Sequence, residues 1–381
     1  MKKVYFLLLT ILLATVTNAQ LTGIKTIPGT YATIAAAITD LNTQGVGAGG
    51  VIFNIAAGYT ETAPVGGYNV TATGTAANTI VFQKSGAGAN PRVTAPVGTI
   101  TLTTTSAAVD GIFTFNGSDY ITIDGIDLLD NNTSGAAMME FGYGFFKPSA
   151  TDGCQNNTIK NCVITMTNAN NVDGTTNIFG PGSKGIYFGN VASNAMTTDL
   201  VIATAGGRSN NNTIVSNTIQ NCFMGIYMRG YGDGVSPYAN LDQGNAIGGN
   251  AAGLGNIIRN FGSATSTLTA FGIQTFNQNN LLDQYNNVNN LAGGGSPAGG
   301  LIGGISATGS FTINNSTYTI KNNTISLGQG TNTSQTSGIN VGTAGGTGTV
   351  TIDANTCTGF TNTSGATAGA VFATVVSNAA G

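Results

Sequence analysis

The residues best suited to chemistry lie around Arg229, where an expected strand leads into a long loop. If Ile226 and Met228 face the core, Tyr227 and Arg229 face outward, because side chains alternate along a strand. Outward tyrosines beside amide groups offer the flat apolar surface and the hydrogen-bond donors that a sugar ring needs. Tyrosine is also common on strand surfaces for its strand propensity alone, so a purely structural role stays open. The candidate ligand-binding residues are Tyr187, Tyr227, Arg229, Tyr231, Gln274 and Asn340.

The composition excludes several kinds of chemistry. None of the 381 residues is His, which excludes a His base, a His zinc ligand and a Ser-His-Asp triad. The 12 Lys and Arg residues are spread thinly, so we expect no nucleic-acid partner. The 17 Phe and 12 Tyr residues argue against disorder and predict a sizeable core.

Two short motifs recur along the chain. A Gly-Ile pair opens a short expected strand at Gly185, Gly225, Gly272 and Gly338, which puts Tyr187, Gln274 and Asn340 at the position of Tyr227. The other motif is Ile-x-x-(Asn/Asp/Cys)-x-(Ile/Cys). It begins at Ile121, Ile159, Ile214, Ile320 and Ile352, with a degenerate copy at Ile257.

The second motif predicts short strands joined by a sharp corner. Asn217 lies at such a corner, and Asn tolerates the left-handed conformation better than other non-Gly residues. In stacked coils these Asn amides can also hydrogen-bond to one another. One coil cannot bury its apolar face alone, so the coils must stack. We therefore predict an all-β parallel β-helix. A β-sandwich is the alternative, but it would not keep the corner motif at one phase through five copies.

The motif copies are unevenly spaced, from 32 to 63 residues apart. A bare coil needs only about 20–25 residues, so long loops must project from several coils, or one gap must contain two coils. The candidate insertions are Asn190–Asn210, Gly230–Gly255 and Asp283–Gly300. Loops on one flank of a solenoid often form its binding face, with flexible decoration as the alternative.

The first 19 residues are predicted to be a secretory signal peptide. Lys2 and Lys3 precede an apolar stretch over residues 4–16, and cleavage is expected after Ala19. A membrane anchor is the weaker alternative, because the stretch is shorter than the ~20 residues of a membrane span. We therefore expect a secreted or cell-surface protein with no membrane span after cleavage.

Export permits disulfides between the four cysteines, Cys154, Cys162, Cys222 and Cys357. Cys154 and Cys162 could pair across a short loop. We favour the alternative that the cysteines are small buried residues in or beside the repeat turns. None of the spacings is CxxC, so they give no support for a metal or redox site.

The N-terminal region resembles that of a known superfamily. An amphipathic helix over Tyr31–Ile38 leads into a buried strand over Val51–Ile55 and then Gly58–Glu61. These segments resemble the N-terminal cap of the pectin-lyase-like right-handed β-helix superfamily, whose coils carry PbH1-like repeats. Thr75–Phe82 and Tyr120–Ile126 resemble its early coils, and the likeness extends over residues 28–381.

The resemblance implies a right-handed parallel β-helix with a short N-terminal capping helix and inserted loops. We expect a signal peptide over residues 1–19, the cap and first coils over 20–110, and further coils over 111–381. The chain most resembles exported surface proteins of Gram-negative bacteria. We therefore also expect it to be a piece of a longer protein with downstream domains.

The enzymes of this superfamily act on polysaccharides, but this sequence lacks the His of its hydrolases and matches no motif of its esterases. We therefore expect a non-catalytic stalk or adhesin that binds a polysaccharide or a cell-surface glycan weakly, without a cofactor. The alternative is a polysaccharide lyase, with Arg229 as base and Ca²⁺ bound by Asp124, Asp127 and Asp130. Against this, Asp124 and Asp127 should face opposite ways on a straight strand, and Asp124 is expected in the corner position of Asn217. A purely structural spacer is the third interpretation.

Overall fold

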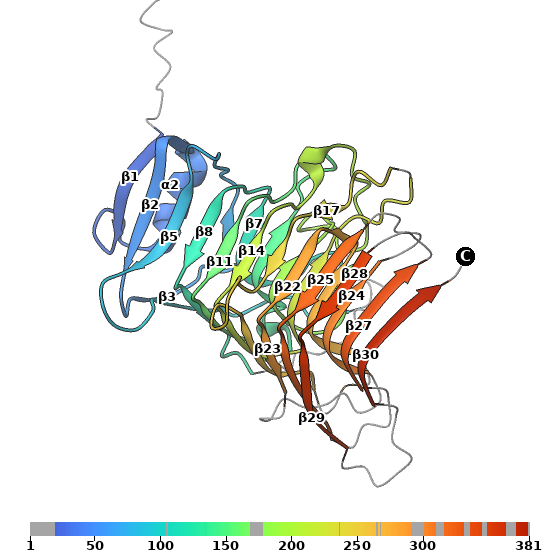
Figure 1. The fold of residues 1–381 in the computed structure, drawn as a ribbon. Helices are drawn as coiled ribbons and strands as arrows, with labels where there is room; N and C mark the ends of the chain where they lie inside the picture. The colour runs from blue at the N-terminus through green and yellow to red at the C-terminus, as the bar shows by residue number, and fades with distance from the viewer. Residues whose placement is uncertain are drawn as a thin grey trace, which may run out of the picture.

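In the computed structural model, each turn of the chain adds one short strand to each of three parallel sheets. The turns stack from the N-terminal cap to the last coils as a right-handed parallel β-helix (Figure 1). The predicted fold class is thus confirmed. The structure describes residues 20–103, 106–133, 135–167, 178–235, 237–263, 266, 268–290, 301–309, 316–330, 336–344, 349–362 and 371–379, so the predicted signal peptide lies outside the described residues.

The three sheets are named A, B and C in the order in which a turn visits them. Sheet A contains β1 (Leu21–Ile27), β2 (Val46–Ala56), β5 (Ile80–Ser85), β8 (Ile121–Asp124), β11 (Thr158–Lys160), β14 (Thr213–Val215), β18 (Ala246–Ile247), β22 (Leu281–Gln284), β25 (Thr317–Lys321) and β28 (Thr349–Asp353). Sheet B contains β3 (Thr60–Thr62), β6 (Arg92–Thr94), β9 (Asp127–Leu129), β12 (Val163–Thr165), β15 (Thr218–Cys222), β19 (Ile257–Phe261), β23 (Asn287–Asn289), β26 (Thr324–Gly330) and β29 (Thr356–Asn362). Sheet C contains β4 (Tyr68–Val70), β7 (Gly111–Asn116), β10 (Phe141–Phe146), β13 (Lys184–Phe188), β16 (Met224–Arg229), β20 (Ala270–Phe276), β24 (Ile302–Thr308), β27 (Thr336–Ala344) and β30 (Val371–Ala379). A small sheet pairs β17 (Asp242–Gln243) with β21 (Gln278–Asn279), and two 3₁₀ turns are η1 (Gly135–Ala137) and η2 (Ala205–Gly207).

The predicted capping helix is α2 (Ile34–Gln44). Thr33 is its N-cap and accepts a hydrogen bond from the Ala36 amide at 3.1 Å. The Glu61 carboxylate accepts from the amide of Ile34 at 2.7 Å and from that of the following residue, where the helix dipole favours a negative charge. Among the described residues, no helix is long and apolar enough to cross a membrane.

The Gly-Ile motif has a steric cause. A glycine stands at this position in successive strands of sheet C, at Gly142, Gly185, Gly225, Gly272 and Gly304. A Cβ added to Gly225 would lie 2.4 Å from the carbonyl oxygen of Gly272 and 2.5 Å from the Ile258 side chain of sheet B. Any larger residue would therefore push sheet C away from sheet B.

The predicted ladder of Asn side chains is confirmed at the corner between sheets A and B. The Nδ2 atom of each Asn donates to the Oδ1 atom of the next, at 2.9–3.2 Å, through Asn217, Asn256, Asn286, Asn323 and Asn355. A shorter ladder, between sheets C and A, joins Asn157, Asn212 and Asn245 and ends on Gln278.

We predicted that the ladder Asn itself is the left-handed residue at the corner. In the structure, the left-handed residue is the one before it. Ser216 has φ 57°, Asn322 has φ 57° and Ala354 has φ 49°. Because the preceding residue makes the bend, the ladder Asn can direct its amide along the stack.

The core is a stack of apolar columns inside the three sheets. One inner column of sheet A has a polar member. In register it contains Phe53, Phe82, Ile123, Ile159, Ile214, Ile247, Asp283, Ile320 and Ile352. The coil that begins with β22 lacks the expected Ile, so the motif missed it. The long gap between Ile257 and Ile320 therefore holds an additional coil, which was one of the two predicted alternatives.

The predicted insertions are only partly loops. Asn190–Asn210 does connect β13 to β14 without a strand. Gly230–Gly255, by contrast, contains β17 and β18. Asp283–Gly300 contains the end of β22 and all of β23. Residues 291–300 of this segment lie outside the described residues. Cys154, Cys162 and Cys222 are buried, as in the favoured interpretation, whereas Cys357 is half-buried, and the alternative Cys154–Cys162 disulfide is not formed.

Candidate functional site

Tyr187 and Tyr227 point away from the β-helix interior, as predicted, but they are not exposed. Their relative exposures are 0% and 4%. Their stacked rings, with centroids 5.7 Å apart, belong to a second apolar cluster that includes Phe179 and Met196 from the segments flanking β13. The predicted open surface of tyrosines is therefore wrong, because inserted loops cover this part of sheet C.

A pocket of about 370 Å³ opens at the edge of this second cluster. Three of the predicted ligand-binding residues line it: Tyr227, Arg229 and Gln274. The other lining residues are Ile178, Gly180, Pro181, Met224, Leu268, Thr269 and Phe276. Aromatic and aliphatic side chains thus surround a few hydrogen-bonding groups, as in small-molecule sites.

The other three predicted residues lie outside the pocket lining. Tyr187 is buried beneath the loops, whereas Tyr231 is half-buried just after β16. Asn340 occupies the register position of Gln274, but it lies two strands further along sheet C. The motif therefore predicted the row of outward positions correctly. It could not show which of them the loops would cover.

Arg229 forms an ion pair with Asp199, which comes from the insertion after β13. The guanidinium contacts the carboxylate through Nη2 at 2.5 Å and through Nε at 3.4 Å. Burial lowers the pKa of Arg229, but the hydrogen bond and charge of Asp199 outweigh it and raise the pKa above its ordinary value. Asp199 has no place in the repeat, so no pattern in the sequence pointed to it.

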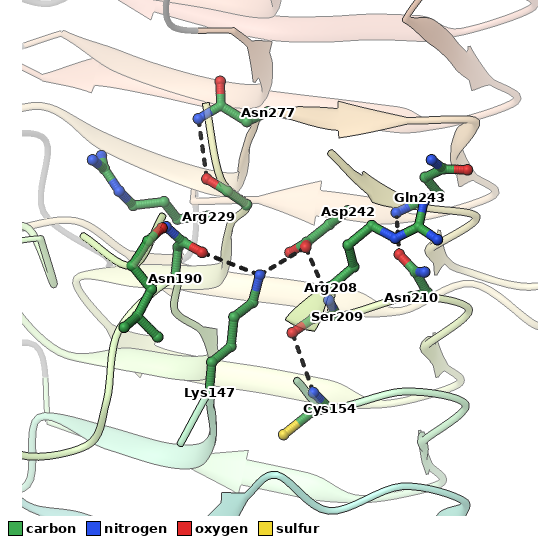
Figure 2. Close-up of polar contacts among 12 residues, drawn as sticks. Lys147, Cys154, Asn190, Arg208, Ser209, Asn210, Arg229, Asp242, Gln243 and Asn277 are labelled. Atoms are coloured by element: carbon green, nitrogen blue, oxygen red, sulfur yellow. Dashed lines mark hydrogen bonds and ion pairs between the residues drawn. The ribbon is translucent and has the colours of Figure 1, made fainter. Parts of the chain in front are cut away.

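A series of polar contacts connects this ion pair to a buried one, and Figure 2 shows its inner part, from Asn190 through Lys147 to Asp242. Asn190 donates to Asp199 at 3.2 Å and accepts from the Lys147 ammonium at 3.2 Å. Lys147 in turn contacts Asp242 at 2.8 Å, with side-chain exposures of 0% and 2%. Burial raises the pKa of Asp242, and the Lys147 charge opposes that rise. This series of contacts holds the loop that carries Asp199 in place, and Asp199 in turn orients Arg229.

Lys184 fixes another wall of the pocket. Its ammonium donates to the carbonyl oxygens of Gly180, Pro181 and Gly182 at 2.8–2.9 Å and lies 3.7 Å from the centre of the Phe179 ring. Burial lowers the pKa of Lys184, but three acceptors and an aromatic face stabilise its charged form. Gly180 and Pro181 line the pocket. Lys184 therefore holds this wall in place although it does not itself line the pocket.

The predicted calcium ligands do not form a site. Asp124 forms an ion pair with Lys160 at 3.1 Å, while Asp127 accepts from the Val163 amide at 2.7 Å. Asp130 is buried and accepts hydrogen bonds from the backbone and side-chain amides of Asn132 and from the backbone amide of Met139. Burial raises the pKa of Asp127 and of Asp130. In the described part of the chain, no three or more His, Cys, Asp or Glu side chains are grouped to hold a metal.

The predicted corner position of Asp124 is also wrong. Sheet register pairs Asp124 with Lys160, and Lys160 with Val215. Asp124 therefore lies two positions before the corner position of Asn217. In that coil Gly125, with φ 70°, is the left-handed residue at the register position of Ser216, and Ile126 takes the position of the ladder Asn.

No family model and no curated protein matches the chain. Among solved structures, it is similar to the GH136 lacto-N-biosidase of Eubacterium ramulus, with 12% identity and a TM-score of 0.46. That match covers 80% of this chain but only 52% of the lacto-N-biosidase, so this chain spans about half of the length of that protein. An alginate lyase of Paenibacillus sp. str. FPU-7 matches with 14% identity and a TM-score of 0.37, over 90% of this chain and 96% of the other.

A third similar structure is the A-module of the mannuronan C-5 epimerase AlgE6 of Azotobacter vinelandii. It has 14% identity and a TM-score of 0.30, over 90% of this chain and 94% of the other. At these identities and scores the likenesses carry no inference about activity. The parallel β-helix is confirmed by the sheet topology, and membership in the pectin-lyase-like superfamily stays a prediction.

Proposed function

We propose that the pocket at Arg229 binds carbohydrate and that the chain is an exported β-helix module that presents this pocket. One observation carries the proposal: Tyr227 and Phe276 line the same pocket as the hydrogen-bonding side chains of Arg229, Gln274 and Thr269. Aromatic rings pack on the apolar faces of a sugar, and the polar groups bind its hydroxyls. Export rests on the predicted signal peptide.

A non-catalytic role, as a stalk or adhesin, fits the pocket lining. Hydrolysis of a glycosidic bond generally requires two carboxyl groups. None of the described residues that line the pocket is Asp or Glu, and the neighbouring Asp199 is engaged by Arg229.

A polysaccharide lyase is the second candidate, and the observation that favours it is the presence of Tyr227, Arg229 and Gln274 in one pocket. Arg229 is a poor base there, because Asp199 stabilises its charged form. Tyr227 would have to take the proton. Burial raises its pKa, and the Arg229 charge opposes that rise.

Calorimetric titration of the mature chain with a panel of neutral and acidic oligosaccharides tests the proposal. We expect Tyr227→Ala to weaken binding about fivefold or more, since loss of an aromatic contact removes roughly 1–3 kcal/mol and about 1.4 kcal/mol corresponds to tenfold. Tyr231→Ala is the matched control, because Tyr231 does not line the pocket, and it should bind like the wild type.

Two results would change the assignment. Release of unsaturated sugar ends, abolished in Tyr227→Phe, would establish the lyase. Failure of the whole panel to bind would refute carbohydrate binding and leave the structural spacer.

A further inference from the structure

We propose that Asp199 makes this pocket select uncharged sugars and reject uronic acids, an inference that rests on the proposed carbohydrate-binding function. Arg229 is the sole charged residue among the described residues that line the pocket. Arginine binds a uronate carboxylate through two parallel N–H donors, which form a planar fork. Asp199 already occupies two such donors, on Nη2 and Nε.

The paired carboxylate also leaves Arg229 able to serve a neutral ligand. A guanidinium has five N–H donors, and those on Nη1 take no part in the contacts with Asp199. Arg229 can thus donate to sugar hydroxyls while its charge is cancelled. An incoming uronate, by contrast, would meet the negative charge of Asp199, whose side chain is 40% exposed.

Asp199 cannot easily turn away to release the arginine. Asn190 donates to its Oδ1 atom, and Asn190 is held by the buried Lys147 and by the Leu200 carbonyl oxygen at 2.7 Å. Lys184, a further cation near the pocket, already donates to three backbone carbonyl oxygens. The charge balance at the pocket is therefore built into the fold.

The test compares binding of neutral xylo-, cello- and manno-oligosaccharides with binding of oligogalacturonate and oligomannuronate. We expect the wild type to bind at least one neutral probe about tenfold more tightly than either uronate. Asp199→Asn keeps the side-chain size but removes the charge. It should raise uronate affinity about tenfold or more, because a charge-assisted hydrogen bond is worth roughly 1.5–3 kcal/mol. The gain should weaken in salt.

Asp124→Asn is the matched control, since it also removes one carboxylate from an ion pair, on sheet A. It should leave uronate binding unchanged. The double variant, which combines Asp199→Asn with Arg229→Gln, should lose the increase in uronate affinity that Asp199→Asn alone produces. Thermal melting checks that each variant is folded.

Three results would overturn the inference. Uronate binding by the wild type as tight as neutral binding would refute it without any variant, and the carbohydrate-binding function would stand. If folded Asp199→Asn binds the uronates no more tightly than the wild type does, the inference is refuted and the carbohydrate-binding function again stands. Failure of the wild type to bind any probe would refute the proposed function itself.

Discussion

Asp283 should make the stability of the β-helix depend on pH. It is 1% exposed and occupies an inner column where the adjacent coils place Ile247 and Ile320. Its Oδ1 atom accepts from Asn286 Nδ2 at 2.8 Å, and its Oδ2 atom has no hydrogen-bond partner among the described residues. None of these three neighbours ionises, so none of them neutralises the carboxylate.

The size of the effect follows from the pKa. Burial raises the pKa of Asp283 from 3.8 to about 7, although the Asn286 hydrogen bond opposes the rise. One pH unit corresponds to about 1.4 kcal/mol, so the ionised carboxylate destabilises the fold by about 4 kcal/mol.

The sign follows from which state holds the proton. Below pH 3.8 both the folded and the unfolded chain carry it, and the penalty is absent. As the pH rises toward about 7 the unfolded chain releases its proton first, so the free energy of unfolding falls. Above that pH the loss is complete.

Asp283→Asn removes the titration and keeps the shape of the side chain. Urea unfolding, followed by circular dichroism at pH values below 3.8 and above 7, should show wild type losing about 4 kcal/mol more than the variant across this range. Other buried carboxylates, such as Asp119 with its pKa raised to about 6 by burial, are common to both proteins and cancel. Asp353→Asn, at an exposed position on β28, is the control. If wild type and Asp283→Asn share one pH profile, the reasoning is wrong.

Two further predictions concern the motifs. Gly225→Ala should destabilise the fold by about 3 kcal/mol in urea unfolding, because its Cβ would approach the Gly272 carbonyl oxygen. Gly234→Ala, with open space around it, should have an effect below about 0.5 kcal/mol, and equal effects of the two would contradict the close-approach argument. Asn256→Ala removes four side-chain hydrogen bonds, two in the ladder and two to the backbone groups of Ile214 and Asn217, and should destabilise the fold by roughly 3–4 kcal/mol, since each contributes about 1 kcal/mol. The exposed Asn250→Ala is its control, and a similar loss there would refute a special role for the ladder.

Local periodicity predicted the coil architecture because strand alternation and corner geometry act over a few residues. The Gly-Ile motif and the Asn ladder are visible in the sequence for that reason. Periodicity failed at Asp283, where the apolar position is polar and a whole coil was missed. It also failed at Asp124, because the copy that begins at Ile121 is two positions out of register with the copy at Ile214.

Strand alternation alone places Tyr227, Arg229 and Gln274 outside the β-helix interior, so these positions can be predicted from the sequence. The site itself depends on contacts between segments that are far apart in the chain. Asp199 lies 30 residues from Arg229, and Asp242 lies 95 residues from Lys147, in segments without any repeat. Their meeting depends on how the insertions pack against sheet C. That packing buries Tyr187, leaves Tyr227 at a pocket, and cancels the charge of Arg229.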